Sequence, residues 1–374
     1  MIAVLYNKAM TQKKMQAKKG DKQKPITMAN RGGAGIGESM GPSRWQLLLL
    51  WLVAADGDLD VDGDVEASQT QQYRDYIALS RLTNYVFFLG GRLRTVRNRR
   101  KPLALLVLFV LVVPLVLFSI FETHATWHKG MGFRSLNVLF YYFWCVTLAM
   151  FVRAATGDPG CLPRNLHVAQ EQRNFRVPQE YYNIVNLPGP GPNTTVQAKY
   201  CRTCRIWRPP RAAHCSTCDC CVAVHDHHCV WLNNCVGQRN YRYFLGMLWG
   251  ATVTSAVLIA NAGVHLHRAR RGARDAPVAV LLIVWGALSA IYPAALLGYH
   301  IAMAGTQQTT REYLSQIGSK NPVMHRVRRN PQNVNDTRSF WRNLLGLWGE
   351  VQGPELSQPR AKHTRGDWRY LHLP

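Results

Sequence analysis

The stretch from Tyr200 to Phe244 reads YCRTCRIWRPPRAAHCSTCDCCVAVHDHHCVWLNNCVGQRNYRYF. It contains eight of the ten cysteines and four of the thirteen histidines in the chain. Two cysteine pairs, Cys201 with Cys204 and Cys215 with Cys218, have the C-x2-C spacing of zinc knuckles. This density of sulfur and imidazole ligands at short, regular spacing predicts a metal-binding module.

The module offers more ligands than structural metals need. Its twelve candidates are Cys201, Cys204, His214, Cys215, Cys218, Cys220, Cys221, His225, His227, His228, Cys229 and Cys235. A closed structural zinc site takes four ligands, so two sites would leave four of these residues over. Spacing alone does not say which residues stay free.

Three neighbouring groups suggest chemistry for a part of the surplus. A thiolate attacks thioesters readily, and a nearby base generates it at neutral pH. An imidazole acts as that base when a carboxylate orients it. Asp226, His227 and Cys229 supply these three groups within four residues. The alternative is that all three are structural, and it would be favoured in an isolated zinc ribbon.

Composition places the module in a membrane protein. The chain has 374 residues and a formal charge of +24, and its apolar residues gather in four long runs. A basic excess fits either nucleic-acid binding or cytoplasmic loops that face anionic lipid, and the apolar runs favour the loops. Outside the module only Cys145 and Cys161 remain. A reducing compartment is therefore expected, not a disulfide framework.

The four runs predict transmembrane helices at 102–121, 136–152, 244–264 and 278–303. Lysine and arginine are dense before the first span and after the second, and only Lys129 and Arg134 lie between them. The positive-inside rule therefore puts the N-terminus and the cysteine-rich module in the cytosol. One loop departs from the rule: the connector HRARRGARDAP at 267–277 would be lumenal, yet it carries four arginines.

These features divide the chain into five parts. We expect a largely disordered cytosolic tail at 1–83, a juxtamembrane segment with spans 1 and 2 at 84–153, and the cytosolic zinc domain at 154–243. Spans 3 and 4 occupy 244–303, and a cytosolic C-terminal segment follows at 304–374. Within the tail, the apolar run 45–55 is too short to span a membrane, and the acidic run after it lacks the full calcium-loop pattern.

The C-terminal segment contains the sequence TTRE at 309–312 and the stretch SFWRNLLGLW at 339–348. The second pattern predicts a short amphipathic helix. Two placements stay open for it, one on the membrane surface and the other against the zinc domain.

The central stretch resembles the signature of the DHHC-type protein S-acyltransferases (palmitoyltransferases), named for the residues at 226–229. The matching pattern is Cys201-x2-Cys204-x3-Arg208-Pro209-x-Arg211-x2-His214-Cys215-x2-Cys218-x2-Cys221-x4-Asp226-His227-His228-Cys229-x-Trp231-x2-Asn234-Cys235-Val236-Gly237. Asp158-Pro159-Gly160 after span 2 and TTRE after span 4 also fit the family. The resemblance covers roughly residues 84–345 and is strongest to the fungal Ras palmitoyltransferases of the endoplasmic reticulum.

The resemblance implies a fold and a partition of the ligands. The fold is an α-helical polytopic membrane protein with four transmembrane helices and a cytosolic double-zinc module between the second and third. One zinc would be held by Cys201, Cys204, His214 and Cys221, and the other by Cys215, Cys218, His228 and Cys235. Cys229 would be the nucleophile, His227 its base and Asp226 the residue that orients His227. Cys220 is interpreted as an extra thiol and His225 as a surface residue, and Val230 stands where the family usually has proline.

The implied activity is two-step S-palmitoylation. Cys229 would take the acyl chain from palmitoyl-CoA and pass it to a cysteine of a membrane-anchored protein, with Ras-like GTPases as candidate substrates. We expect Trp231 and Phe244 to border an acyl cavity and Arg239 and Arg242 to meet the CoA phosphates. A small accessory subunit is a further candidate partner. The implied location is the endoplasmic reticulum membrane, with the Golgi as the alternative.

Two other functions are compatible with parts of the sequence. A zinc module tethered to the membrane could recruit a partner without catalysis, which predicts zinc but no covalent acyl species. Nucleic-acid binding would use the basic charge, but the sequence contains no identifiable readout surface and the four spans oppose it.

Overall fold

The computed structural model describes residues 72–74, 83–97, 103–164, 182–186, 195–318, 327–331, 333–349 and 362–364. The expectations for residues 1–44 and for the apolar and acidic runs at 45–66 lie outside these ranges.

Four helices in this part of the chain are long and apolar enough to cross a membrane, which confirms the predicted fold class. The first, Ala104–Thr126, consists of α4 (Ala104–Leu117), a π-helical segment η1 (Phe118–Thr123) and α5 (His124–Thr126). The others are α6 (Met131–Thr156), α7 (Tyr241–Arg268) and α8 (Pro277–Gly305). The last three have 26, 28 and 29 residues, more than the roughly 20 that a bilayer requires, so they extend beyond the predicted spans.

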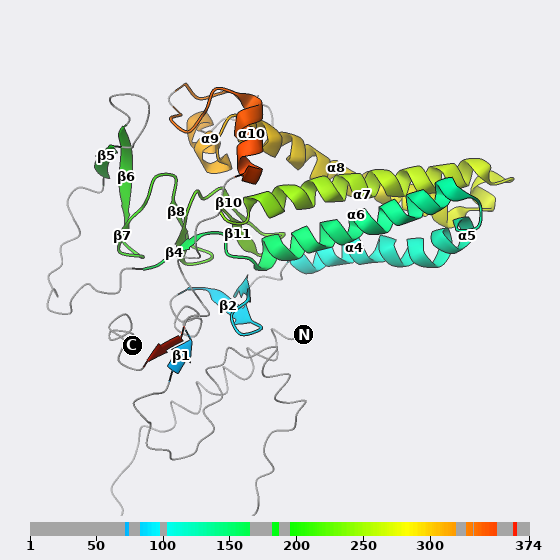
Figure 1. The fold of residues 1–374 in the computed structure, drawn as a ribbon, viewed down its shortest axis with the longest axis horizontal. Coiled ribbons are helices and arrows are strands. Elements are labelled where there is room, and N and C mark those ends of the chain that lie inside the picture. Colours follow the sequence, from blue (N-terminus) through cyan, green and yellow to red (C-terminus); the bar gives the residue numbers. More distant parts are fainter. Residues whose placement is uncertain are drawn as a thin grey trace, which may run out of the picture. The chain divides into compact units, whose positions relative to one another are not determined.

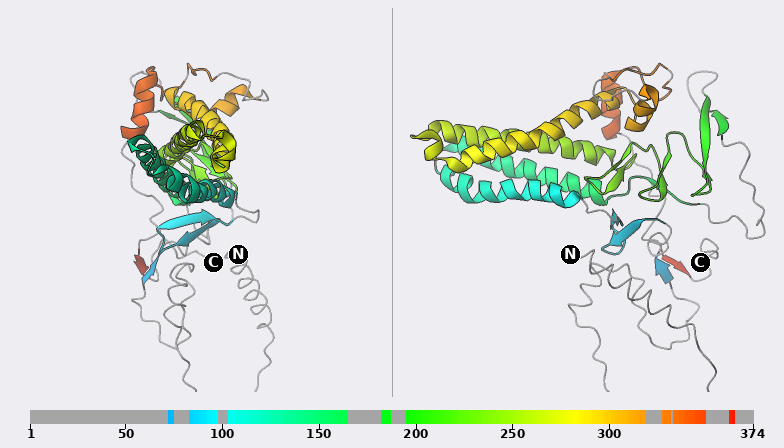
Figure 2. Two further views of the ribbon diagram at one scale, coloured as in Figure 1. Left: turned by 90° about the vertical axis from the view of Figure 1, so that its right-hand side faces the viewer. Right: turned by 180° about the vertical axis from the view of Figure 1, so that it is seen from behind.

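Helix α7 lies between α6 and α8 and packs against both along its length (Figures 1 and 2). Small residues allow the close contact with α6, because a Cβ atom at Gly246 or Gly250 would meet Met150 or Thr147 at 3.1 and 2.7 Å. Gly246 and Gly250 are four residues apart and therefore share one face of α7, as in the small-residue interfaces of membrane helices.

The end of the bundle away from the cysteine-rich module combines an apolar core with a buried polar network. Phe118 and Phe140 stack at 4.0 Å between ring centroids. Beside them, His265 Nδ1 lies 2.7 Å from Glu122 Oε2, and Asn261 donates a 2.6 Å hydrogen bond to Asn137 Oδ1. Polar groups in a membrane are costly unless they are paired, so these contacts tie the first three spans to one another.

The module between α6 and α7 is built from short strands. β4 (Cys161–Leu162), β9 (Cys220–Val222) and β8 (Ala213–Cys215) form one antiparallel sheet. β5 (Tyr182–Asn186), β6 (Thr195–Cys201) and β7 (Ile206–Trp207) form another, and β10 (His227–Cys229) pairs with β11 (Asn234–Val236). The hairpin of β2 (Tyr85–Phe88) and β3 (Leu93–Val96) precedes the first span, and β1 (Gln72–Arg74) pairs with β12 (Lys362–Thr364).

Two asparagines fix the module to the end of α6. The side-chain amides of Asn234 and Asn240 both donate to the carbonyl oxygen of Ala154, at 3.2 and 3.1 Å. Asn234 also donates to Gly157 O at 2.9 Å. Carbonyls at a helix C-terminus have no partner within the helix, so these bonds satisfy them and join the module to the bundle.

The C-terminal segment returns to the same end of the bundle. Helix α9 (Thr310–Ile317) begins with a capping box between Thr309 and Glu312. Helix α10 (Phe340–Gly349) packs mainly against α8, and Asn343 donates a 2.9 Å hydrogen bond to Gly305 O. Trp341, Leu345 and Trp348 are exposed along one face of α10, so the membrane-surface placement of this amphipathic helix stays a prediction.

The contact between α10 and α8 gives a test. A Cβ atom at Gly305 would clash with the ring of Phe340, whereas one at Gly298 on the same helix would meet nothing within 4 Å. We therefore expect Gly305→Ala to displace α10 and to lower the melting temperature of the detergent-solubilised protein, with faster proteolysis near residue 340. Gly298→Ala is the matched control and should leave both unchanged. Equal behaviour of the two variants would contradict this packing.

Candidate active site and metal centres

The first ligand cluster gathers Cys201, Cys204, His214 and Cys221 from β6, the turn after it, β8 and β9. Their ligand atoms all lie within 4.8 Å of one another. His214 Nδ1 is 3.4 Å from Cys204 Sγ and 3.9 Å from Cys221 Sγ. The four residues are those that the family resemblance assigned to one metal.

The second cluster gathers Cys215, Cys218, His228 and Cys235. His228 Nδ1 lies 3.7 Å from Cys215 Sγ, 3.4 Å from Cys218 Sγ and 3.7 Å from Cys235 Sγ. The two sets interleave along the chain because β8 contributes one ligand to each of them. Consecutive residues His214 and Cys215 thus belong to different clusters.

Both clusters fit zinc. Tetrahedral zinc with three thiolates at about 2.3 Å and one imidazole at about 2.0 Å has edges of roughly 3.5 to 3.8 Å between ligand atoms. The separations of 3.4 to 3.9 Å match these edges. Three cysteines with one histidine is a common ligand set of closed structural zinc sites.

Of the two residues that the assignment left over, one differs from expectation. The prediction that His225 is a surface residue is wrong: it is buried, and its Nε2 lies 3.6 Å from Cys235 Sγ. Cys220 is also buried, and its Sγ lies 3.2 Å from that of Cys161 on the neighbouring strand β4. Both side chains thus belong to the packed interior around the second cluster.

Strand β10 contributes side chains both to the second ligand cluster and to a cavity. Successive side chains of a strand point to opposite faces. His228 points with its ladder partner Cys235 toward the second metal cluster. His227 and Cys229 share the other face, and both line a cavity among the helices. Adjacent residues of β10 therefore face different surroundings, His228 the ligand cluster and Cys229 the cavity.

Asp226 connects this strand to the C-terminal segment. Its Oδ2 lies 2.6 Å from His227 Nδ1, and its Oδ1 accepts a 2.7 Å hydrogen bond from the backbone N–H of Thr310. The carboxylate is buried, so both contacts exclude competing water. The bond at Nδ1 leaves Nε2 of His227 as the nitrogen available to a reacting group.

The electrostatics of this pair favour a charged imidazole. Burial opposes the charge on His227, but the hydrogen bonds and charges of Asp226 and Cys229 outweigh it and raise the pKa of His227 to about 9. For Asp226, burial would raise the pKa, but His227, His300 and the Thr310 N–H together lower it. Hence His227 can hold a proton beside Cys229 at neutral pH.

Arg211 holds the C-terminal segment in place. Its guanidinium forms two hydrogen bonds to Glu312, from Nε to Oε1 at 2.7 Å and from Nη2 to Oε2 at 2.8 Å. The same Nη2 donates to Gln307 O at 3.0 Å. A two-pronged arginine–carboxylate pair has a defined geometry, so it fixes Thr310 where it meets Asp226.

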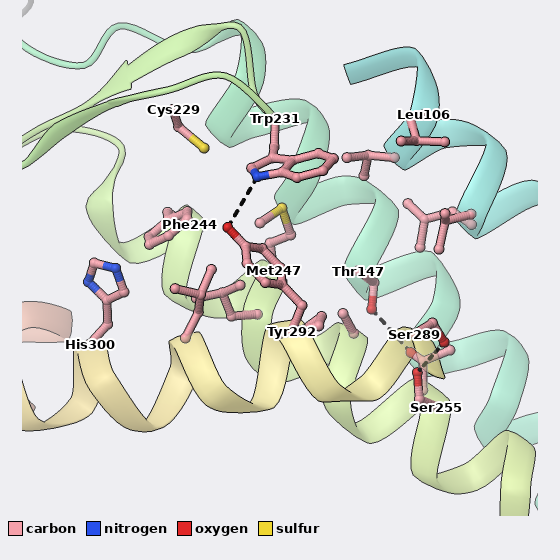
Figure 3. Close-up of a pocket in the computed structure, with 18 of the residues that line it drawn as sticks. Leu106, Thr147, Cys229, Trp231, Phe244, Met247, Ser255, Ser289, Tyr292 and His300 are labelled. Atoms are coloured by element: carbon pink, nitrogen blue, oxygen red, sulfur yellow. Dashed lines mark hydrogen bonds between the residues drawn. The ribbon is translucent and has the colours of Figure 1, made fainter. Parts of the chain in front are cut away.

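The cavity beneath Cys229 has a volume of about 730 Å³ and is lined mainly by apolar side chains of α4, α6, α7 and α8. Figure 3 shows the Cys229 thiol pointing toward it from β10. Trp231 and Phe244, predicted to border an acyl cavity, both line it. At the deeper end the hydroxyl of Thr147 lies 3.1 Å from that of Thr254, and Ser255 lies 3.4 Å from Ser289.

The two predicted phosphate ligands lie beside the cavity and are engaged within the protein. Arg239 Nε is 3.3 Å from Asp158 Oδ2. Arg242 and Arg153 each donate a 2.9 Å hydrogen bond to the Tyr243 hydroxyl, and both guanidinium groups stack on that ring at 4.9 Å. Contact with a CoA phosphate thus stays a prediction for Arg239 and Arg242.

Sequence reasoning missed Tyr292 and His300, and it noted Thr310 only as part of the sequence TTRE, without its contact to Asp226. His300 lines the cavity, contacts Phe244 edge-on at 4.9 Å, and its Nδ1 lies 3.2 Å from the Tyr241 hydroxyl. An ionisable residue within an apolar span was a usable signal, because such residues rarely face lipid. No comparable signal marked Tyr292, which receives a hydrogen bond from Trp231.

Comparison with known proteins agrees with this geometry. A family model described as DHHC palmitoyltransferase matches residues 194–317. The palmitoyltransferase ERF2 of Candida glabrata is 50% identical over 341 residues, which cover 89% of this chain and 100% of that relative. The palmitoyltransferase ERF2 of Saccharomyces cerevisiae is 50% identical over 330 residues, which cover 88% and 89%. That of Yarrowia lipolytica is 36% identical over 270 residues, which cover 66% and 64%.

The charge on His227 predicts a pH dependence of stability. Its pKa is raised from 6.5 to about 9, so the stabilisation that Asp226 provides is fully present below 6.5 and is lost as the pH rises through about 9. We expect Asp226→Asn to lower the melting temperature at pH 7.5, with the gap to wild type narrowing by pH 10. Asp275→Asn, in the loop between α7 and α8, is the control and should show no such trend. A gap that stays constant across this range would contradict the pairing.

Proposed function

Because the chain belongs to the DHHC palmitoyltransferase family and is a protein-cysteine S-palmitoyltransferase, we propose that Cys229 carries the acyl group between palmitoyl-CoA and the acceptor. One observation carries this assignment. Cys229 lies at the mouth of the apolar cavity, next to a His227 that Asp226 orients through a 2.6 Å contact. The non-enzymatic zinc module and the nucleic-acid binder gain no support from the relatives.

The first half-reaction forms the acyl-enzyme. His227 takes the thiol proton of Cys229 and stays charged beside the thiolate, which its raised pKa favours. The thiolate attacks the thioester carbonyl, a carbon–sulfur bond forms at Cys229, and the bond to CoA breaks. The departing CoA thiolate receives the proton from His227. Asp226 keeps the imidazole oriented throughout.

The second half-reaction repeats these steps with a protein thiol. The neutral imidazole of His227 removes the proton of the acceptor cysteine, whose thiolate attacks the acyl carbonyl. The bond to Cys229 breaks, and Cys229 recovers the proton. Between the two steps the acyl chain gains on the order of 0.8 kcal/mol per buried methylene, which favours its retention in the apolar cavity.

We assign one structural zinc ion to each ligand cluster, Cys201–Cys204–His214–Cys221 and Cys215–Cys218–His228–Cys235. Bound zinc would link strands that are too short to fold on their own hydrogen bonds. Because β8 supplies a ligand to each site, the two zinc ions would make the module one unit. His228 would anchor β10 and so hold the neighbouring Cys229 at the cavity.

Several finer assignments rest on the resemblance to the fungal Ras palmitoyltransferases. We propose Ras-like GTPases as acceptors, a small accessory subunit as a partner, and the endoplasmic reticulum as the compartment, with the Golgi as the alternative. The CoA phosphates would lie against the basic residues at the module's edge, with Arg239 and Arg242 as candidates. The N-terminus, the zinc module and the C-terminal segment would face the cytosol, because basic residues are dense in these parts.

The role of Cys229 is tested with purified protein and clickable palmitoyl-CoA. Cys229→Ser should abolish the hydroxylamine-sensitive acyl-enzyme and also transfer to a Ras-like GTPase, because the attacking thiolate is gone. Cys145→Ser is the control: this thiol is exposed on α6 and belongs to neither metal cluster, so its loss should change neither readout. Wild-type labelling of the Cys229→Ser protein would contradict the assignment.

The zinc content of the same purified variants distinguishes a nucleophilic cysteine from a metal-binding one. Cys229→Ser should retain two zinc ions per chain, whereas Cys215→Ser should lose one or both and become inactive as a consequence. Loss of zinc from Cys229→Ser would mean that Cys229 is a ligand.

Orientation is tested in the loop between α7 and α8. We expect a glycosylation acceptor inserted near Gly272 to be modified, because this loop would be lumenal although it is rich in arginine. An acceptor inserted in the C-terminal segment after α10 should stay unmodified, and the tagged protein should co-localise with a marker of the endoplasmic reticulum. The reverse glycosylation pattern would overturn the topology.

A further inference from the structure

The cavity opens sideways, between the first and the fourth membrane span. Its lining residues on α6 and α7 are buried or half-buried. Four of its lining residues are exposed, namely Leu106 (46%), Val230 (50%), Leu288 (67%) and Tyr292 (53%). They come from α4, from α8 and from the loop after Cys229. Apart from Val230, they lie within segments that span the membrane, so the opening faces lipid.

One hydrogen bond crosses the rim of this opening. Trp231 Nε1 donates to the Tyr292 hydroxyl at 3.1 Å, and the two rings lie 5.8 Å apart (Figure 3). Trp231 follows Cys229 by two residues, whereas Tyr292 belongs to α8 directly before Pro293. The bond therefore joins the loop that carries the thiol to the helix that forms one side of the opening.

An acyl-CoA at a membrane surface has its chain in the lipid and its phosphates in water. A chain that had to enter from the aqueous side would expose its methylenes to water before it reached the cavity, at a cost that grows with each one. A lateral opening avoids this step, because the chain passes from one apolar environment directly into another. The head group can stay at the surface meanwhile.

We propose that the gap between α4 and α8 is a lateral portal through which the acyl chain enters from the bilayer, and that the Trp231–Tyr292 bond is the latch that closes it behind the chain. This inference rests on the proposed role of Cys229 as the acyl carrier. It adds a positioning residue, Tyr292, that touches the reacting sulfur only through the loop it holds. Leu288 is the exposed residue of α8 that lines the opening on this side.

The portal predicts a chain-length-dependent defect. Leu288→Trp should slow acyl-enzyme formation from palmitoyl-CoA severalfold, because the larger ring narrows the gap, and it should leave butyryl-CoA unaffected. Leu281→Trp is the matched control, since Leu281 is exposed on α8, seven residues earlier, and does not line the cavity. Normal butyryl transfer also demonstrates that the variant is folded. Equal rates for the two tryptophan variants with palmitoyl-CoA would overturn the portal.

The latch predicts a change in KM rather than in kcat. Tyr292→Phe removes only the hydroxyl, so a loaded palmitoyl chain should escape faster and raise KM for palmitoyl-CoA by about fivefold, the effect of one neutral hydrogen bond. KM for butyryl-CoA should not change. Trp231→Phe should match it, and the double variant should be no worse than either single one. The latch would be overturned if the KM increases of the two single variants multiplied in the double variant. It would also be overturned if KM rose equally for palmitoyl-CoA and butyryl-CoA.

These outcomes are separable from failure of the proposed function. If wild-type protein forms no acyl-enzyme at Cys229 with either thioester, the carrier assignment fails. If wild type, Leu281→Trp and Leu288→Trp are all acylated by palmitoyl-CoA at the same rate, Cys229 remains the proposed carrier and the portal is wrong.

Discussion

The alternation of side chains along β10 is the constraint on which the active site depends. His228 faces the second metal cluster, and His227 and Cys229 face the cavity, because neighbouring residues of a strand point in opposite directions. His228, a member of the second ligand cluster, thus lies between the two residues for which we propose the catalytic roles. The arrangement places the Cys229 thiol next in sequence to a residue of this cluster without making it a member of the cluster.

Contacts with α6 and with α9 hold β10 and its side chains in this position. Asn234 and Asn240 tie the module to the end of α6, and Arg211 with Glu312 holds the start of α9 against it. Through the Thr310 N–H, α9 supplies the second hydrogen bond of Asp226. The C-terminal segment is therefore a part of the active site, although it lies some eighty residues after the nucleophile.

Much of this could be predicted from sequence, for physical reasons that differ by feature. Long apolar runs determine membrane helices almost alone, so the four spans were found. The candidate ligands followed from residue type, but their partition between two clusters did not. The neighbours His214 and Cys215 on β8 belong to different clusters, and spacing along the chain cannot reveal which ligands meet in space. His225 was misplaced because a polar residue beside an aspartate looks exposed until its packing is known. Nothing in the sequence pattern marked Tyr292, because its hydrogen bond joins it to Trp231, which is far away in the sequence.

The bonds from Asn234 and Asn240 to Ala154 have a consequence for where the enzyme works. They tie the module directly to the C-terminal end of α6, so the depth of Cys229 relative to the lipid midplane follows from the length of that helix. A thinner or thicker bilayer cannot be matched by a hinge. It must be met by tilt of the whole bundle or by deformation of the lipid. The thickness of the host membrane thereby becomes a variable that sets how deep the thiol lies below the surface.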